Sequence, residues 1–413
     1  MIRSRFRPPA MICMDTETLA QLRGNVSAPK LVGRFVGAAL MAAACIATNV
    51  LSAGPAAAQA PSSSDMCNNA DKAYPPDVVI YGCSSVIGAG SQNPLDVAIA
   101  LNNRGLAFRA KGDIARALAD YDAAVRLDPG YAGAYNNRGV TLHDRGEIER
   151  AFADYDQAIR LDPRNATAFV NRGIAFRDKG ALDRAIADYN EAIRLDPHYA
   201  TAFTNRGNAY REMGDLDRAA ADYSEAIALD PMNPVAFNNR GAAYLIKGDL
   251  DHALAYYSEA IRLDPRYALA FNNRGIAYRD KGDLDHAVAD YGEAIRINPR
   301  FGNAFTNRGD AYRDKGEFER ALADYSEAVR INPRNAVAVV NRGFVRLKLG
   351  DLDQSILDYD AALKLNPSFA GALYGRGLAK RKKGDRAGAD ADLAAAKAMR
   401  PDIAEEFVKF GVE

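Results

Sequence analysis

Asparagine, arginine and glycine recur together in this sequence at intervals of 34 residues, and their types and spacing suggest a binding surface. An amide side chain offers both donors and an acceptor, which matches the two polar groups of a peptide bond. One amide per interval on one face of the fold predicts a ladder that holds an extended chain by its backbone. Local hydrogen bonding by the same amides is the alternative, and the sequence leaves the two open. The ladder asparagines are Asn103, Asn137, Asn171, Asn205, Asn239, Asn273, Asn307 and Asn341.

An arginine precedes every recurring glycine, and an aspartate recurs in the second half of all intervals but one. A charge placed repeatedly near a helix interface predicts an Arg–Asp pair that ties two helices together. Contact between these arginines and a ligand is the alternative. Tyr256 replaces the aspartate in one interval, so Arg240 is predicted to lack its usual partner. The arginines are Arg104, Arg138, Arg172, Arg206, Arg240, Arg274, Arg308, Arg342 and Arg376, and the aspartates are Asp120, Asp154, Asp188, Asp222, Asp290, Asp324, Asp358 and Asp392.

Catalytic and metal-binding motifs are not evident. The sequence has no glycine-rich phosphate loop and no G-x-S-x-G motif, and its four histidines, His143, His198, His252 and His286, form no ligand pattern. We therefore predict no enzyme activity, no catalytic residues, no metal and no cofactor. The formal net charge is zero, with 53 basic and 53 acidic residues. Nucleic-acid binding is not expected, because proteins that bind nucleic acids carry a basic stripe.

Two helices per interval must position these side chains. In residues 268–301, apolar residues at helical spacing predict a first helix that ends at Gly282, and Asp283 begins a second helix. Pro299 ends that second helix at the residue before it. Two helices joined so tightly lie antiparallel. Gly275 lies inside the first helix, where glycine costs about 1 kcal/mol against alanine, so we expect it to face small residues of the second helix.

The interval and its pattern of side chains resemble the tetratricopeptide repeat (TPR) family. The family pattern of large, Gly, aromatic, Ala, aromatic, Ala and Pro is filled in one copy by Phe271, Gly275, Tyr278, Ala287, Tyr291, Ala294 and Pro299. The resemblance implies an all-α fold, a right-handed superhelical TPR solenoid of stacked antiparallel helix pairs. The nine expected repeats are 98–131, 132–165, 166–199, 200–233, 234–267, 268–301, 302–335, 336–369 and 370–403, followed by a C-terminal capping helix in 404–413.

The resemblance also implies a function. TPR proteins bind protein or peptide partners, and the asparagine ladder is similar to the one that holds substrate peptides in the TPR region of O-linked N-acetylglucosamine transferase. We therefore expect a non-enzymatic scaffold or adaptor that binds an extended segment in a concave groove. The family's carboxylate clamp is not expected, because it requires lysine immediately before the ladder asparagine. A membrane-anchored envelope assembly factor and a self-associating array without a groove ligand remain alternatives.

Residues 1–60 differ in composition from the rest of the chain. Lys30 and Arg34 precede the apolar run 35–51, and Ala-Gln-Ala occupies 58–60. This pattern is typical of a secretory signal peptide, here with cleavage after Ala60. The protein is therefore predicted to be exported, in a bacterium to the periplasm. An uncleaved leader that anchors the array in a membrane is the alternative.

Residues 61–97 are predicted to form a linker and a helical cap on the first repeat. Cys67 and Cys83 are the only cysteines after residue 60. Two cysteines in an exported chain favour a disulfide, which would join two short helices. Two buried free thiols would be expected instead in a cytosolic protein.

Overall fold

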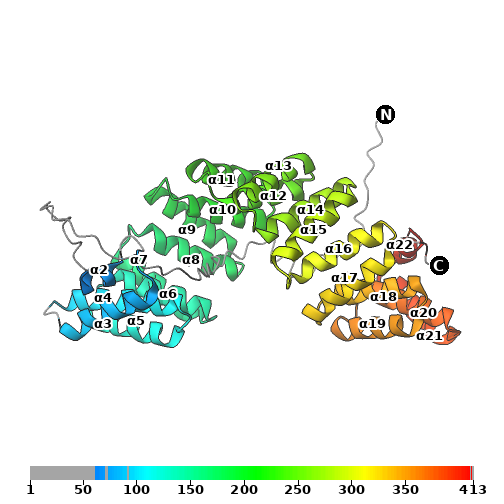
Figure 1. Cartoon of the computed structure of the whole chain (residues 1–413), viewed down its shortest axis with the longest axis horizontal. Helices are drawn as coiled ribbons and strands as arrows, with labels where there is room; N and C mark the ends of the chain where they lie inside the picture. The colour runs from blue at the N-terminus through cyan, green and yellow to red at the C-terminus, as the bar shows by residue number, and fades with distance from the viewer. Residues whose placement is uncertain (1–60, 70–72, 91–92, 410, 412–413) are drawn as a thin grey trace, which may run out of the picture. The chain divides into compact units, whose positions relative to one another are not determined.

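The computed structural model describes residues 61–69, 73–90, 93–409 and 411. All regular secondary structure in these residues is helical (Figure 1). The predicted signal peptide and its cleavage site lie in 1–60, outside the described residues. The chain divides into two compact units, and the boundary falls between Arg206 and Gly207.

The N-terminal unit begins with two helices of unequal length, α2 (Ser63–Asn68) and α3 (Pro76–Ala89). Antiparallel pairs then follow at the 34-residue interval. They are α4 (Pro94–Ala110) with α5 (Ile114–Leu127), α6 (Ala132–Asp144) with α7 (Ile148–Leu161), and α8 (Ala166–Asp178) with α9 (Leu182–Leu195).

The C-terminal unit starts within α10 (Ala200–Glu212) and continues the same pairing. The even-numbered member of each pair is called the first helix and the odd-numbered member the second helix. The elements are α11 (Leu216–Leu229), α12 (Pro234–Lys247), α13 (Leu250–Leu263), α14 (Ala268–Lys281), α15 (Leu284–Ile297), α16 (Gly302–Asp314), α17 (Phe318–Ile331), α18 (Ala336–Leu349), α19 (Leu352–Leu365), α20 (Ala370–Lys382), α21 (Arg386–Met399) and α22 (Ile403–Lys409).

The turn inside each repeat follows from a glycine with positive φ, and in six of the nine repeats an aspartate caps the second helix. Gly282 ends α14 with a φ of 87°, in the left-handed region where glycine carries no Cβ penalty. Asp283 caps α15, because its Oδ1 accepts a hydrogen bond from the backbone N–H of His286 at 3.2 Å. Asn298 is extended after α15, as expected for a residue before proline. The predicted helix pair of this repeat is confirmed.

The glycine inside the first helix makes room for an aromatic ring in every repeat but the last, where Gly377 faces Leu393. A Cβ at Gly275 would lie 2.7 Å from Cε1 of Tyr291, which is fully buried in the second helix. Our expectation that Gly275 faces only small residues was therefore wrong. Ala287 and Ala294 are buried on the same second helix, and the ring of Tyr291 lies against the glycine. The ring needs a position without a side chain opposite it, and this explains the mid-helix glycine.

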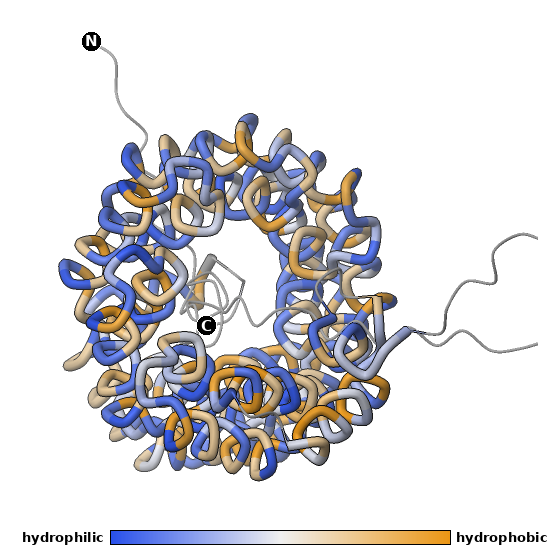
Figure 2. The backbone as a smooth tube through the Cα atoms, turned by 90° about the vertical axis from the view of Figure 1, so that its left-hand side faces the viewer, coloured by the Kyte–Doolittle hydropathy of each residue, from blue (hydrophilic) through white to orange (hydrophobic). Residues whose placement is uncertain are grey.

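Apolar and polar residues alternate along the helices, as Figure 2 shows by hydropathy. Second helices such as α15 bury one stripe, which contains Ala287, Tyr291 and Ala294. First helices such as α20 are buried on most sides. Within the part of the chain that the structure describes, no helix is both long and apolar enough to cross a membrane.

A disulfide joins the two N-terminal helices. Cys67 of α2 and Cys83 of α3 are bonded, with their Cα atoms 4.5 Å apart, and both are buried. Gly82 lets the helices approach, since a Cβ there would lie 2.7 Å from Cβ of Met66. Asn103 of α4 donates from Nδ2 to the carbonyl oxygen of Cys67 at 3.3 Å, so the disulfide-linked pair is attached to the first repeat.

The last helix, α22, covers the apolar end of the C-terminal unit. Ile403 and Phe407 are buried, at 0% and 1% exposure. The ring of Phe407 packs against Tyr374 and Phe344, with centroids 4.9 and 5.7 Å apart. These contacts cover the apolar surface of α18 and α20 that another repeat would otherwise bury.

Candidate functional site: the first-helix face

The first helices of successive repeats contact one another directly. In the N-terminal unit α4 contacts α6 and α6 contacts α8, and in the C-terminal unit the contacts run from α12 through α14, α16 and α18 to α20. Each second helix packs between two first helices, as α13 does between α12 and α14. Within each unit the first helices thus form one surface. We call it the first-helix face, and it includes residues 207–212 of α10.

The ladder asparagines bond from repeat to repeat along this face. Asn273 donates from Nδ2 to Oδ1 of Asn238 in the preceding first helix at 3.1 Å. The equivalent bonds, to the residue 35 positions earlier, join Asn137 to Asn102 at 2.8 Å, Asn171 to Asn136 at 2.9 Å and Asn307 to Asn272 at 2.9 Å. Asn239 and Asn341 bond instead to the residue 31 positions earlier, Asn208 at 3.1 Å and Asp310 at 3.0 Å.

Two of the eight asparagines make other contacts. Asn103 bonds to Cys67, as described above, and Asn205 donates to the carbonyl oxygen of Thr201 at 2.9 Å within α10. Asn205 also accepts from the guanidinium of Arg177 at 3.3 Å. All eight predicted residues therefore lie on first helices and have hydrogen-bond partners within the chain.

The asparagine that precedes a ladder asparagine connects these bonds into a longer chain of hydrogen bonds. Asn272 donates from Nδ2 to Oδ1 of Asn273 at 3.3 Å, and its own Oδ1 accepts from Asn307. Asn205, Asn239, Asn273 and Asn341 are buried, whereas Asn103, Asn137, Asn171 and Asn307 are half-buried. The bonds show that the ladder ties repeats together. The peptide-binding role of these eight residues stays a prediction, because no ligand is present.

Seven of the eight predicted Arg–Asp pairs are confirmed. Arg274 donates from Nε and Nη2 to both carboxylate oxygens of Asp290, at 2.7 and 2.8 Å. Such a two-point contact is the strong form of the guanidinium–carboxylate bond. The same pair joins Arg104 to Asp120, Arg138 to Asp154, Arg172 to Asp188, Arg308 to Asp324, Arg342 to Asp358 and Arg376 to Asp392.

Most of these arginines have a second partner that sequence reasoning missed. Arg138 also donates from Nη1 to Asp122 of α5 at 2.8 Å, and Arg274 donates to Ser258 of α13 at 3.1 Å. One guanidinium therefore links its own second helix with the second helix of the preceding repeat. A polar residue two positions after six of the eight recurring aspartates was the available sequence signal.

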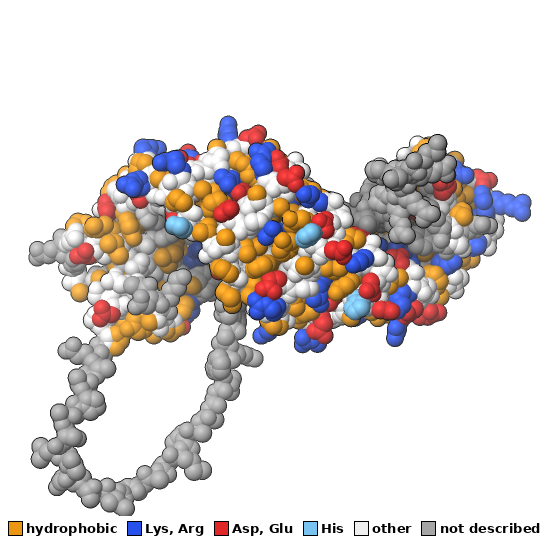
Figure 3. Space-filling model, turned by 90° about the horizontal axis from the view of Figure 1, so that it is seen from above, with side chains coloured by type: hydrophobic (Ala, Val, Ile, Leu, Met, Phe, Trp, Pro, Cys, Tyr) orange, Lys and Arg blue, Asp and Glu red, His pale blue; other side chains and the backbone are white. Residues whose placement is uncertain are grey.

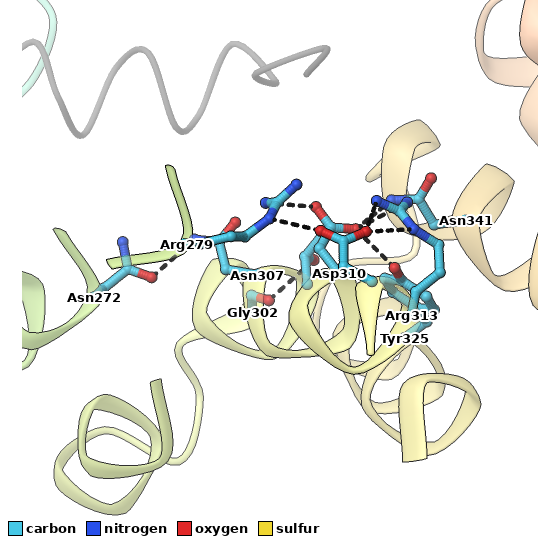
Figure 4. Close-up of polar contacts among 10 residues, drawn as sticks. Asn272, Arg279, Gly302, Asn307, Asp310, Arg313, Tyr325 and Asn341 are labelled. Atoms are coloured by element: carbon cyan, nitrogen blue, oxygen red, sulfur yellow. Dashed lines mark hydrogen bonds and ion pairs between the residues drawn. The ribbon is translucent and has the colours of Figure 1, made fainter. Parts of the chain in front are cut away.

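A cluster of charged side chains on this face surrounds Asp310 (Figure 4). Asp310 of α16 is 9% exposed and accepts hydrogen bonds from Tyr325 at 2.7 Å and from Asn341 at 3.0 Å. Arg279 of α14 and Arg313 of α16 lie 3.2 and 3.3 Å from the same carboxylate. Burial and this nearby carboxylate raise the pKa of Tyr325 well above its ordinary value.

Asp310 was not singled out from the sequence. The equivalent position holds an apolar residue in seven of the nine repeats, namely Leu106, Val140, Ile174, Ala242, Ile276, Phe344 and Leu378. A carboxylate at a position that is usually apolar was the signal that could have identified it. Acidic and basic side chains are interspersed on the face shown in Figure 3, in keeping with a surface of mixed sign.

Three family models described as TPR repeat or tetratricopeptide repeat match the chain. Their matches cover residues 91–132, 102–163, 173–214, 207–248, 234–267, 268–301, 309–350 and 345–384. The chain is a tetratricopeptide repeat protein. The predicted fold class, an all-α TPR solenoid of stacked antiparallel helix pairs, is confirmed by these matches and by the helix pairs of both units.

Solved TPR structures are similar to this chain. A tetratricopeptide repeat protein from Parabacteroides merdae is 22% identical, with a TM-score of 0.50 over 60% of this chain and 98% of its own. The Cut9–Hcn1 heterotetramer of the APC/C is 17% identical, with a TM-score of 0.52 over 73% of this chain and 59% of its own. YrrB, described as a TPR protein with an unusual peptide-binding site, is 26% identical, with a TM-score of 0.36 over 45% of this chain and 95% of its own.

No curated protein matches the sequence. The TPR fold generally serves as a protein–protein interaction scaffold, and its members are typically non-enzymatic and bind proteins or peptides.

Proposed function

We propose that this TPR protein is a non-enzymatic scaffold that binds an extended segment of a partner protein along its first-helix face. The observation behind the proposal is that some side chains of this face are the same in successive repeats, whereas others differ. Ladder amides and Arg–Asp pairs repeat along the chain, whereas the side chains three and six residues after each ladder asparagine change. In the C-terminal unit these are Asn208 and Arg211, Ala242 and Leu245, Ile276 and Arg279, Asp310 and Arg313, and Phe344 and Leu347.

This variation has a physical cost that stacking alone would not require. Apolar residues at Phe344 and Leu347 bury well between first helices, whereas Asp310 and Arg313 must be desolvated at the equivalent places. An array that only held itself together would favour the apolar version throughout. A surface that distinguishes one partner from another needs a different residue at each step along the segment.

The ladder asparagines divide into two groups under this proposal. The four buried residues hold the first helices in register. The four half-buried residues, Asn103, Asn137, Asn171 and Asn307, also keep an N–H group for the backbone of the segment, because each amide has two and only one bonds to the preceding element.

A pull-down from native extract tests the proposal with two matched variants. Leu106→Glu places a charge on first helix α4 at a side chain that is 38% exposed, and Ala119→Glu places one at an exposed residue of second helix α5. We expect Leu106→Glu to lose partners that wild type and Ala119→Glu retain, with unchanged circular dichroism in both. Loss of the same partners with Ala119→Glu alone would contradict the proposal.

We also propose that the chain is exported and cleaved after Ala60. The buried Cys67–Cys83 disulfide supports this, because structural disulfides persist in oxidising compartments. The intact mass of the native protein should correspond to a chain that starts at Pro61. A native protein that retains residues 1–60 would favour a membrane-anchored array instead.

A further inference from the structure

Two buried side chains on α10 carry hydrogen-bond donors that have no partner. These donors are Nδ2 of Asn208 and Nε and Nη2 of Arg211. Asn208 is 0% exposed and Arg211 is 6% exposed. Buried polar groups are normally paired, because a donor without an acceptor costs the full price of its desolvation. The two residues are three apart on one helix and therefore share a face.

The acceptor of Asn208 is already in use. Its Oδ1 accepts from the hydroxyl of Tyr223 at 2.8 Å and from Nδ2 of Asn239 at 3.1 Å. These two bonds fix the orientation of the amide and leave its NH₂ group as a donor only. Glu212 follows Arg211 in sequence but accepts a hydrogen bond from neither Nε nor Nη2 of its guanidinium.

The equivalent place three repeats later shows which group is missing (Figure 4). There Asp310 takes the position of Asn208, and Arg313 that of Arg211. The Asp310 carboxylate accepts from a tyrosine and a ladder asparagine, just as Asn208 does, and it also lies 3.3 Å from the Arg313 guanidinium. Arg313 also donates to Asp314, the residue that follows it, at 2.9 Å. With Asn208 in place of the aspartate, the carboxylate three residues before the arginine is lost, and an NH₂ donor stands in its place.

The next repeat does not supply the missing acid either. Arg279 pairs with two aspartates of the following first helix, Asp310 at 3.2 Å and Asp314 at 3.1 Å. The residues that stand in those two places relative to Arg211 are Ala242 and Ile246 of α12. Of the acids that serve Arg279 and Arg313, only Asp314 as the neighbour of Arg313 has an acidic equivalent beside Arg211, namely Glu212. Nε and Nη2 of Arg211 nevertheless have no acceptor.

We propose that Arg211 and Asn208 form a binding site for a carboxylate of the partner segment. The inference rests on the proposed function, because the segment must lie along the first-helix face to reach α10. A carboxylate only accepts hydrogen bonds, so it satisfies the guanidinium fork and the amide together. The carboxylate comes from an acidic side chain within the segment or from its C-terminus. Ile246, which is 53% exposed, offers an apolar contact beside the site.

Peptide libraries test the site and its source of carboxylate. The affinity of the full chain for three libraries of nine-residue peptides with randomised flanks is measured by interferometry. The neutral library has a central Asn/Gln and an amidated C-terminus. The two carboxylate libraries have either a central Asp/Glu and an amidated C-terminus, or a central Asn/Gln and a free C-terminus. We expect one of the two carboxylate libraries to bind at least about 10-fold more tightly than the neutral one. The library that binds more tightly shows whether the carboxylate belongs to an acidic side chain or to the C-terminus of the segment. Arg211→Gln should abolish this gain, and Arg266→Gln, at an exposed arginine, should leave it unchanged.

Equal affinity for the three libraries would overturn the carboxylate site and leave the proposed function standing. Absence of binding by all three would also overturn the site. The cross-linking experiment that ends the Discussion would still decide the proposed function in that case, because it requires no peptide.

A second test needs no ligand. Ile246→Asp places a carboxylate where Asp314 stands relative to Arg279, and Ile246→Asn is its neutral control. We expect Ile246→Asp, but not Ile246→Asn, to raise the midpoint of thermal unfolding by a few degrees and to remove the library preference. An unchanged midpoint together with an unchanged preference would contradict the proposed site.

Discussion

The guanidinium carbon of Arg240 lies 4.4 Å from the centroid of the Tyr256 ring. At the equivalent place, seven other repeats pair the arginine with an aspartate. Tyr256 also stacks on Tyr244 of the first helix, with centroids 5.4 Å apart. A cation–π contact thus replaces an ion pair between the same two helices. The arginine keeps an interhelical partner when its aspartate is absent, which supports a structural role for this position.

Removing one aspartate should destabilise its repeat. Asp290→Ala leaves Arg274 without its two-point acceptor in a mostly buried setting, where breaking such a pair costs about 2 to 3 kcal/mol. Native-state hydrogen exchange should show this loss in α14 and α15. Asp251→Ala is the control, since Asp251 pairs with Lys281 in an exposed ion pair whose loss should change the free energy of unfolding far less. Equal effects of the two substitutions would contradict the structural role of the buried pairs.

Replacing either of two glycines in the same repeat by alanine should change the free energy of unfolding in opposite directions. A Cβ at Gly275 would meet Tyr291 at 2.7 Å, so Gly275→Ala should destabilise the protein by about 1 to 3 kcal/mol. The nearest atom to a Cβ at Gly292 is Nη1 of Arg308 at 3.7 Å, so Gly292→Ala should stabilise α15 by up to about 1 kcal/mol. Urea denaturation measures both. A tolerated Gly275→Ala would mean that the ring does not require the glycine.

Alkaline pH should unfold the array through its buried tyrosines. Burial raises the pKa of Tyr121 to about 12, above the ordinary value near 10. The unfolded chain therefore loses this proton first, so the associated stability is present below pH 10 and is lost as the pH rises to about 12. Circular dichroism against pH should show the loss. Tyr121→Phe removes only this buried hydroxyl, and it should make the pH dependence shallower. An identical pH profile for the variant would count against this explanation.

Reducing the disulfide should release the N-terminal helices and spare the repeats. Cys67 and Cys83 are 16 residues apart, and a cross-link of that span contributes about 3 kcal/mol. Hydrogen exchange in a reductant should show loss of protection in α2 with little change from α6 onward. The double variant Cys67→Ser and Cys83→Ser should show the same loss of protection in α2 without reductant. Full protection of α2 in both cases would show that the disulfide is dispensable.

Much of the fold could be predicted from the sequence because its signals are local and repeated. Gly282 and Asp283 specify a turn and a cap wherever they recur, and the Arg–Asp pairs follow from a strict spacing between two helices already placed by that turn. The packing of Gly275 against Tyr291 was harder to predict, because a glycine in a helix shows that room is needed but not which side chain fills it.

The candidate site was only partly predictable. All eight ladder asparagines were located, but their bonds to the preceding repeat depend on how closely two first helices approach, which no single repeat determines. The pairing of Arg279 with Asp310 could not be predicted for the same reason, since the two residues belong to different repeats. Asn208 and Arg211 could be recognised as unpaired only by comparison with that pair.

Site-specific photo-cross-linking tests most directly whether the first-helix face binds the partner. A benzophenone amino acid replaces Ile246 of first helix α12 or, as the matched control, Ala255 of second helix α13, and both positions are exposed. The protein is irradiated in native extract and its cross-linked products are compared. We predict that position 246 captures a discrete protein that position 255 does not. Capture from position 255 alone would show that partners bind the opposite side of the repeats and would contradict the account.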